Sequence, residues 1–179
     1  MLKVKLLFLL CCTLFVISLQ AQTVKSYIPN ETPNERYTLH TNGTVTDTWS
    51  GLMWQRCSLG QTWNGSTCTD IDGHGLYTWQ IALHRAERNS FAGYSDWRLP
   101  NRKELRSIVA YNAYYPAINR TVFPNTLSRY YWSSSPNAYD IIGAWGAWIV
   151  DFKYGYVEGY SHTGQAFAGA AVRLVRDGQ

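Results

Sequence analysis

Only two stretches of this sequence have the spacing of an amphipathic helix, and β-type runs flank both of them. The first spans residues 78–88, where the apolar side chains that share one helical face are Trp79, Ala82, Leu83 and Ala86. The polar side chains of the opposite face include His84, Arg85 and Arg88. Because Trp79 falls on the apolar face, we expect it in the core rather than on a ligand-binding surface.

The second helical stretch lies in the segment DWRLPNRKELRSIV, residues 96–109. Asn101 can cap the start of this helix, and Glu104 at the third helical position completes a capping box. The predicted buried stripe is Leu105, Ile108 and Val109. Asp96 and Arg98 precede the helix, and we expect these two side chains to pair and stabilise the turn.

The rest of the sequence alternates short β-type runs with turn signals. Asn42-Gly43 predicts a hairpin with a type I′ turn, because both residues tolerate positive φ. Residues 147–152 alternate as a half-buried strand does, with Trp148, Val150 and Phe152 on one face and Ala147, Ile149 and Asp151 on the other. Two helices set between such β segments indicate an α+β domain, with no sign of a second domain.

The first 21 residues have the layout of a secretory signal peptide. Lys3 and Lys5 precede an apolar run over residues 6–19, and small or polar residues follow near Ala21. The run has roughly 14 residues, fewer than the ~20 that a membrane-spanning helix needs, which disfavours the alternative of an uncleaved anchor. We therefore predict a protein that is secreted, periplasmic or at the cell surface, without membrane insertion after cleavage.

Residues 22–35 are polar and contain two prolines, which predicts an exposed lead-in to a domain over residues 36–179. Without Lys3 and Lys5, 14 basic residues remain against 12 acidic ones, a net charge of +2. A chain so nearly balanced has no overall basis for binding nucleic acid or a membrane surface. Any basic binding site must therefore be local.

Two cysteines remain after the leader, Cys57 and Cys68. In an exported protein they are expected to form a disulfide that closes a short loop rich in Gly, Asn and Ser. We interpret this disulfide as structural, because a redox pair is more often spaced Cys-x-x-Cys and two ligands alone do not make a zinc site.

Several motifs in order along the chain resemble one family. These motifs are TVTDTWSGLMWQ, AGYSDWRLPNRKELRSIV, PAIN, FPNT, YYWSSSP, AWIVDF and VRLVR. Together they span residues 37–176 and resemble the Lcl C-terminal domain family, named for a collagen-like bacterial adhesin. The resemblance implies a C-type-lectin-like fold of the branch that includes formylglycine-generating enzymes. In that fold, two helices flank a twisted antiparallel sheet with long irregular loops.

The resemblance also implies candidate functions. In the collagen-like adhesin the domain binds sulfated polysaccharides and trimerises through a collagen-like stalk. This sequence has no Gly-x-y repeat, so neither the ligand nor the trimer is carried over directly, and the oligomeric state stays open.

Nothing in the sequence predicts an enzyme. Formylglycine-generating enzymes rely on cysteines in the later part of the domain, whereas this chain has none after Cys68. Neither a GxSxG elbow nor an HExxH motif is present. The histidines are scattered through the sequence at positions 40, 74, 84 and 162. We therefore predict no catalytic residues and no cofactor.

A calcium site is the main metal alternative, because many lectins of this fold use calcium. Asp70, Asp72 and His74 alternate as in an EF-hand loop. The twelfth position is Ile81, where such a loop requires a bidentate Glu. We predict no metal site.

Exposed aromatic faces are the feature that a metal-independent carbohydrate site needs. Tyr130 and Trp132 lie beside the serines at 133–135, and we select them as candidate ligand-binding residues. Tyr154, Tyr156 and Tyr160 in the last hairpin are further aromatic residues of this kind. The alternative is that these side chains belong to the β core and its cross-strand pairs.

The other candidate ligand-binding residues are Arg85, Arg88, Arg102, Lys103 and Arg106. Guanidinium groups bind sulfate or carboxylate through bidentate, charge-assisted hydrogen bonds. Arg102 and Arg106 are one helical turn apart, so both helices could contribute to one basic strip if they are neighbours. A cation at a helix N-terminus is slightly disfavoured by the dipole. An ordinary solvated surface is the competing interpretation.

The function that these observations favour is an exported, non-catalytic bacterial binding module. Its partner would be a glycan, including an anionic or sulfated polysaccharide, or a cell-surface protein. The alternative is an exported structural protein, associated with a pilus or the envelope, that binds no glycan.

Overall fold

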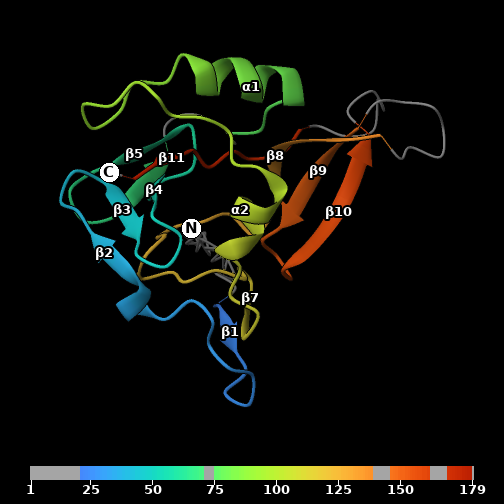
Figure 1. Cartoon of the computed structure of the whole chain (residues 1–179). Coiled ribbons are helices and arrows are strands. Elements are labelled where there is room, and N and C mark those ends of the chain that lie inside the picture. The colour runs from blue at the N-terminus through green and yellow to red at the C-terminus, as the bar shows by residue number, and fades with distance from the viewer. Residues whose placement is uncertain (1–20, 71–74, 139–145, 162–168, 179) are drawn as a thin grey trace, which may run out of the picture.

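The computed structural model of the chain describes residues 21–70, 75–138, 146–161 and 169–178 (Figure 1). Within this part the α-helices are α1 (Trp79–Glu87) and α2 (Arg102–Ser107), and short antiparallel strands make up most of the remaining regular structure. The predicted α+β class is confirmed. Neither α1 nor α2 is long and apolar enough to cross a membrane, and the described residues contain no other candidate.

A four-stranded antiparallel sheet in the order β11-β4-β3-β2 forms one side of the domain. Its strands are β2 (Tyr37–Leu39), β3 (Thr44–Asp47), β4 (Leu52–Gln55) and β11 (Val175–Asp177). The predicted hairpin at Asn42-Gly43 joins β2 to β3, and Asn42 Oδ1 accepts hydrogen bonds from the Thr44 amide and hydroxyl. Only Gly43 of the pair has a positive φ, at 83°, so the type I′ assignment is wrong.

A three-stranded antiparallel sheet in the order β10-β9-β8 lies on the other side, with α2 between the two sheets in Figure 1. Its strands are β8 (Tyr130–Asn137), β9 (Gly146–Asp151) and β10 (Tyr156–Ser161). Two smaller sheets pair β1 (Thr23–Val24) with β7 (Ala113–Tyr114) and β5 (Gln61–Trp63) with β6 (Cys68–Asp70). A short 3-10 helix, η1 (Asn34–Arg36), precedes β2. The expectation of one twisted sheet is therefore wrong: the described residues form four.

The central strand β9 is buried on both faces. Val150 and Phe152 belong to one hydrophobic cluster with Leu105 of α2, whereas Ala147 and Ile149 belong to a second cluster. The predicted half-buried strand is therefore wrong, because other elements cover both faces of this middle strand along most of its length. Trp148 is the partly exposed residue of β9.

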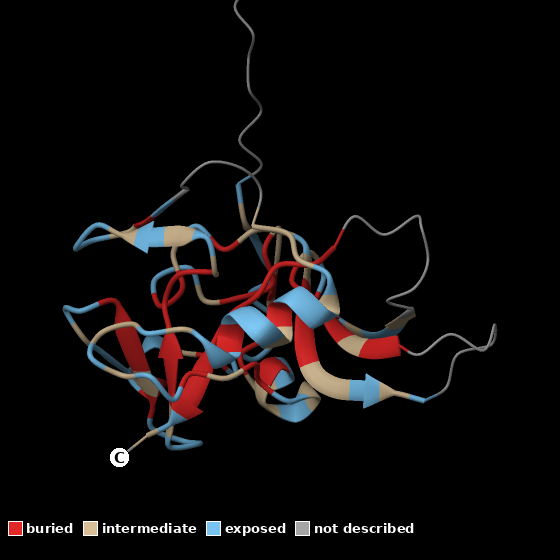
Figure 2. Cartoon of the chain, turned by 90° about the horizontal axis from the view of Figure 1, so that it is seen from above, coloured by how far each residue is buried: buried red, intermediate tan, exposed pale blue. Residues whose placement is uncertain are grey.

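The C-terminal segment over residues 170–177 joins the two larger sheets. Ala171 exchanges backbone hydrogen bonds with β8, donating to the Tyr130 carbonyl and accepting from the Trp132 amide. Three residues later the Leu174 carbonyl accepts from the Gln55 amide, and β11 then pairs with β4. Figure 2 shows the buried residues concentrated in this interior of the domain.

Arg173 lies fully buried in the middle of this segment. Its guanidinium donates to the carbonyls of Gln55 and Arg56 and to the hydroxyls of Ser58 and Thr126. No described carboxylate pairs with it, and burial lowers the pKa of Arg173. This cation is therefore held by neutral oxygen atoms, which tie the C-terminal segment to β4 and to the loop before β8.

The disulfide between Cys57 and Cys68 is confirmed, with the two Cα atoms 5.4 Å apart. The predicted lead-in is mostly exposed, yet it also forms β1. The Gln22 side chain donates to the carbonyls of Pro116 and Ile118, which fixes its start against the domain. Residues 1–20 of the predicted signal peptide lie outside the described part of the chain.

Both predicted helices are present with the expected buried faces. In α1, Ala82 and Ala86 are buried, and the Trp79 indole donates to the Ser133 carbonyl, which confirms it as a packing residue. In α2 the buried stripe is Leu105, Ile108 and Val109, although the helix ends at Ser107.

The predicted pairing of Asp96 with Arg98 is wrong. Arg98 bridges Val175 in an antiparallel arrangement, which brings Asp96 and Arg98 beside the charged residues of β11. Asp96 accepts from Arg176 at 2.8 Å and Arg98 donates to Asp177 at 2.7 Å. The sequence showed two opposite charges close together, but Asp96 pairs with a residue 80 positions further along the chain, and Arg98 pairs with Glu104 as well as with Asp177.

Candidate functional site

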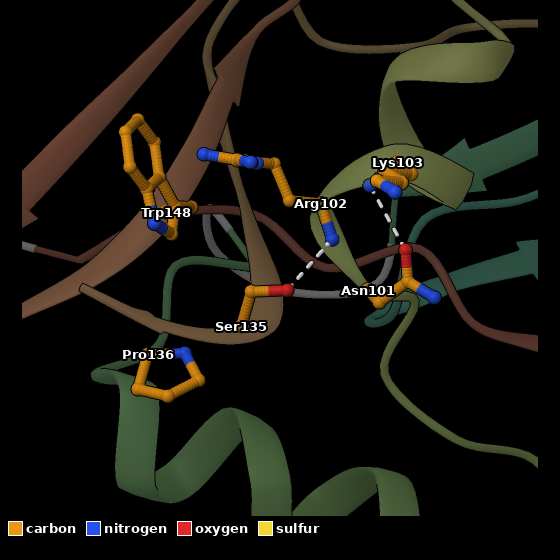
Figure 3. A pocket seen from close by; sticks show the side chains of 6 residues that line it. All are labelled: Asn101, Arg102, Lys103, Ser135, Pro136 and Trp148. Atoms are coloured by element: carbon orange, nitrogen blue, oxygen red, sulfur yellow. Dashed lines mark hydrogen bonds between the residues drawn. The ribbon is translucent and has the colours of Figure 1, made fainter.

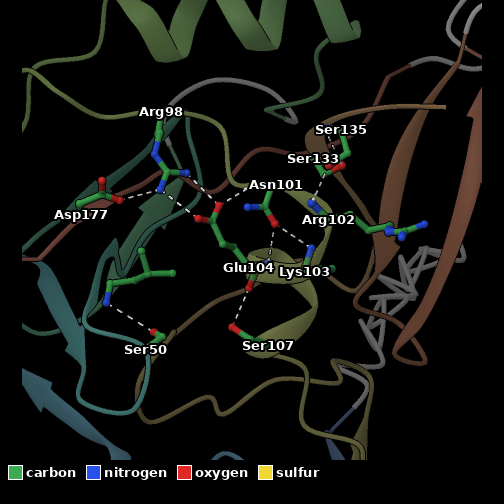
Figure 4. A network of polar contacts seen from close by, with 11 residues as sticks. Ser50, Arg98, Asn101, Arg102, Lys103, Glu104, Ser107, Ser133, Ser135 and Asp177 are labelled. Carbon is green, nitrogen blue, oxygen red and sulfur yellow. Dashed lines mark hydrogen bonds and ion pairs between the residues drawn. The ribbon is translucent and has the colours of Figure 1, made fainter.

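The N-terminus of α2 is fixed by a network of polar contacts (Figure 4). Asn101 Oδ1 accepts from the amides of Lys103 and Glu104, and Glu104 accepts from the Asn101 amide, which confirms the predicted capping box. Arg98 donates two hydrogen bonds to the Glu104 carboxylate, at 2.8 and 2.9 Å. These bonds fix the first turn of α2 and therefore the direction in which its side chains point.

Arg102 is anchored from a different element. Its amide donates to the hydroxyl of Ser135 in β8 at 2.9 Å. Its guanidinium lies over the indole of Trp148 in β9, with Cζ 4.2 Å from the ring centroid (Figure 3). This geometry is a cation–π contact, and it holds the arginine side chain against the sheet.

Two adjoining hollows are both lined by this stacked pair, and each is about 320 Å³ in volume. One is lined by Asn101, Arg102, Lys103, Ser135, Pro136 and Trp148. The other is lined by Arg102, Lys103, Arg106, Trp148 and Val157. We call the two together the α2 hollow.

The described charged residues that line the α2 hollow are all basic. Arg102, Lys103 and Arg106 line it, and none of its described lining residues is acidic. The pKa of Arg106 is raised, chiefly by the hydrogen bond from its Nε to the Tyr111 hydroxyl at 2.8 Å. The hollow can therefore bind an anionic group through guanidinium and ammonium donors beside an indole ring.

The structure separates the predicted basic residues of α1 from those of α2. Arg102, Lys103 and Arg106 share the α2 hollow, whereas Arg85 and Arg88 are exposed on α1 and line neither half of it. A third hollow, of about 670 Å³, lies between α1 and the start of α2. Its charged lining residues are Glu87, Asp96, Arg98 and Glu104. Acidic side chains thus stand where a single basic strip was expected, so that hypothesis is not supported.

The two predicted aromatic candidates do not line the α2 hollow. Trp132 is only 1% exposed, and its indole donates to the Tyr77 carbonyl, so it has no face for a ligand. This correction follows from its place in β8 opposite Ile149, in the second hydrophobic cluster. Tyr130 pairs with Asp151, on the face of the sheet opposite to Trp148, and packs against Tyr160.

Trp148 is the site residue that sequence reasoning missed. The alternating pattern of residues 147–152 marked it as an ordinary strand residue. It becomes part of a site only because α2 places Arg102 on its ring, and the two residues are far apart in the sequence. The feature of the sequence that could have marked Trp148 is its size. The neighbouring residues Gly146 and Ala147 are small, so another element must cover the large ring.

A comparison with known families agrees with the motifs described above. The model of the Lcl C-terminal domain matches residues 43–176, which include α2, β9 and the buried C-terminal segment. A search of curated proteins gives no match. Because the matched region covers most of the chain, the protein belongs to the Lcl C-terminal domain family.

Proposed function

We propose that this protein is an exported, non-catalytic binding module that recognises an anionic glycan at the α2 hollow. One observation carries the proposal: Arg102 is stacked on Trp148 in a hollow that Lys103 and Arg106 also line, without an acidic residue among its described lining side chains. Carboxylated and sulfated sugars both present groups of the chemistry that this arrangement binds.

The stacked guanidinium is suited to this task. Its N–H groups lie in the plane of the group, so a ring that covers one face leaves the edge able to donate to sulfate or carboxylate. Among the described residues, the Arg102 side chain has no hydrogen-bonded partner. The indole beside it offers an apolar face on which a sugar ring can lie.

Export is supported by the disulfide and by the predicted leader. The Cys57–Cys68 bond is the kind that persists in an oxidising compartment. The protein would therefore meet glycans outside the cytoplasm.

A C-type-lectin-like fold is a further part of the proposal. It is supported by the two helices, the small antiparallel sheets and the pairing of the C-terminal strand β11 with β4. Superposition of an experimental structure on a C-type lectin domain tests it. Matching positions for both helices and for β3, β4 and β9 support this fold, and a different strand order contradicts it.

The test of function is calorimetric titration of the purified protein with heparin oligosaccharides at several salt concentrations, with neutral dextran as the control. We expect heparin to bind and dextran not to bind. The affinity should fall as salt rises, because about three cations contact the polyanion. Binding that does not respond to salt, or no binding to heparin, would contradict the proposal. If crosslinking then found a stable protein complex, the alternative of a structural envelope protein would replace it.

A further inference from the structure

Two tyrosines that are 39 residues apart in the sequence meet at the surface of the domain. Tyr115 directly follows β7, and Tyr154 lies in the turn that joins β9 to β10. Their hydroxyls are hydrogen-bonded at 2.6 Å, and their ring centroids are 5.2 Å apart with the ring planes at 71°. The sequence marked Tyr154 as a possible ligand contact but gave no sign that Tyr115 would be its neighbour.

Backbone hydrogen bonds hold the two segments together. The Tyr115 amide donates to the Lys153 carbonyl, next to Tyr154 in the sequence. Two residues after Tyr115, the Ala117 amide donates to the Phe152 carbonyl. The contact between the two rings is therefore set by the fold and does not depend on the tyrosine side chains alone.

The hydroxyl contact brings reactive carbon atoms of the two rings close to each other. When a phenol loses one electron and its hydroxyl proton, the unpaired electron spreads over the oxygen and over the ortho and para carbons. The para carbon of a tyrosine carries the side chain, so the ortho carbons are the ones free to form a bond. Each ortho carbon neighbours the carbon that bears the hydroxyl, so the hydrogen bond between Tyr115 and Tyr154 holds the two rings close to a reactive arrangement.

The orientation of the rings also fits a bond between ortho carbons. Two phenols joined in this way are twisted out of one plane, because the groups beside the new bond would otherwise collide. The angle of 71° between Tyr115 and Tyr154 is a twist of this kind. Little movement is therefore needed to join them.

An oxidant in solution can reach this pair. Tyr154 is 43% exposed, and Tyr115 is partly exposed. The sulfur-containing side chains of the described residues, which oxidants often attack, are protected: Cys57 and Cys68 are joined to each other, and Met53 is only 9% exposed. The tyrosine pair is thus an accessible target for oxidation.

Lys153 favours the loss of an electron from one ring of the pair. Its ammonium group lies 5.3 and 5.0 Å from the ring centroids of Tyr115 and Tyr154. The hydrogen bond with Tyr115, together with the contact to Lys153, lowers the pKa of Tyr154. A phenolate gives up an electron more readily than a phenol, so Tyr154 is the ring that should be oxidised first.

We propose that Tyr115 and Tyr154 are an oxidative modification site, at which hydrogen peroxide used by a haem peroxidase joins the two rings as an intrachain dityrosine. Each phenol gives up one electron and its hydroxyl proton, and the two phenoxyl radicals form a carbon–carbon bond between ortho positions. The hydrogen on each of these carbons then moves to the oxygen of its own ring, which restores two phenols. The peroxide takes up both electrons and both protons and leaves as two water molecules.

The crosslink would act as a second staple in the domain. It ties the segment after β7 to the β9–β10 turn across 39 residues, whereas the disulfide spans 11. A covalent link across a longer stretch removes more entropy from the unfolded chain. The inference goes beyond the proposed function and does not depend on glycan binding.

The test is to treat the purified protein, at low concentration, with peroxidase and hydrogen peroxide. Intact mass, dityrosine fluorescence and mass spectrometry of proteolytic peptides then identify the product. We expect a monomer that has lost two hydrogen atoms and contains a peptide linking Tyr115 to Tyr154. Its melting temperature should be about 5 °C higher than that of the untreated protein.

Two matched variants separate this pair from other tyrosines. Tyr154→Phe keeps the ring but removes the phenol, and should lower the yield of intrachain crosslink at least about tenfold, since Tyr115 loses the phenol that it contacts. Tyr156→Phe removes a neighbouring phenol whose ring centroid is 6.0 Å from that of Tyr154, and should leave the yield within about twofold of that of the natural protein.

Several outcomes would overturn the inference. Covalent dimers in place of a monomeric product would show that the rings react between molecules. A linked peptide that joins other tyrosines, or an equal yield from Tyr154→Phe and the natural protein, would assign the reaction to another site. A crosslinked protein with an unchanged melting temperature would overturn the role of the link as a staple.

Discussion

Two arginines show how the same side chain serves opposite purposes in two regions of this molecule. Arg173 in the C-terminal segment and Arg102 in α2 both lie over an aromatic ring, at 4.8 Å from Phe123 and 4.2 Å from Trp148. Arg173 is fully buried, and both of its terminal nitrogens donate to protein oxygen atoms, whereas Arg102 is partly exposed beside a hollow. The ring contact alone therefore does not indicate a binding residue. The two arginines differ in whether protein oxygen atoms already accept hydrogen bonds from the guanidinium group.

The largest effect should come from the core arginine. Arg173→Met removes the donors to two carbonyls and two hydroxyls in the interior, while it relieves the burial of a cation. We expect a net loss of about 3 kcal/mol in the free energy of unfolding, measured by urea denaturation, because several buried acceptors lose their partners. A variant as stable as the natural protein would show that the buried hydrogen bonds of Arg173 do not stabilise the fold.

The matching change at the surface should affect binding instead. Arg102→Gln is expected to weaken heparin binding about tenfold, because one charge-assisted contact is lost. The free energy of unfolding should change by less than about 0.5 kcal/mol, since the backbone bond of residue 102 to Ser135 remains. Loss of stability without loss of heparin affinity would show that Arg102 stabilises the fold and does not bind the ligand.

A smaller effect should follow from removing the N-cap of α2, which positions Arg102. Asn101→Ala removes the acceptor for the amides of Lys103 and Glu104, and should cost about 1 kcal/mol of stability. Heparin affinity should fall about two- to threefold as the first turn of α2 loses its fixed direction. Asn101→Ser keeps a capping oxygen and should restore both quantities. Equal behaviour of the Ala and Ser variants would argue against the cap as the positioning element.

The smallest effect concerns ionisation, where the core and the surface again differ. Burial raises the pKa of the Tyr37 phenol, whereas the hydrogen bond with Tyr115 lowers the pKa of Tyr154 and raises that of Tyr115. Of these three tyrosines, Tyr154 should thus ionise first, below the ordinary tyrosine value of about 10, and Tyr37 last. NMR of labelled tyrosine checks the order, and Tyr154→Phe should remove the first titration step.

Features that depend on neighbouring residues were predictable from the sequence. The capping box at Asn101 and Glu104, the buried stripe of α2 and the hairpin at Asn42-Gly43 depend on residues within a few positions. The disulfide was predictable because only two cysteines follow the predicted leader.

Features that depend on long-range packing were not predictable. Asp96 and Arg98 exchange partners with the C-terminal segment, and Trp148 meets Arg102 only because α2 packs on β9. Trp132 was assigned to a ligand site for the same reason, since burial of a β residue depends on what covers its face. Half of the candidate site, the arginines of α2, was therefore predictable, and its aromatic half was not.

The most direct test of the central claim compares two double variants that remove the same charge. One is Arg102→Gln with Arg106→Gln in the α2 hollow, and the other is Arg85→Gln with Arg88→Gln on α1. Calorimetric titration with a heparin octasaccharide should show a loss of about thirtyfold for the first and less than about twofold for the second, because only the first removes cations from the built site. Equal losses would show that net charge alone governs binding, and would contradict the assignment of the site to the α2 hollow.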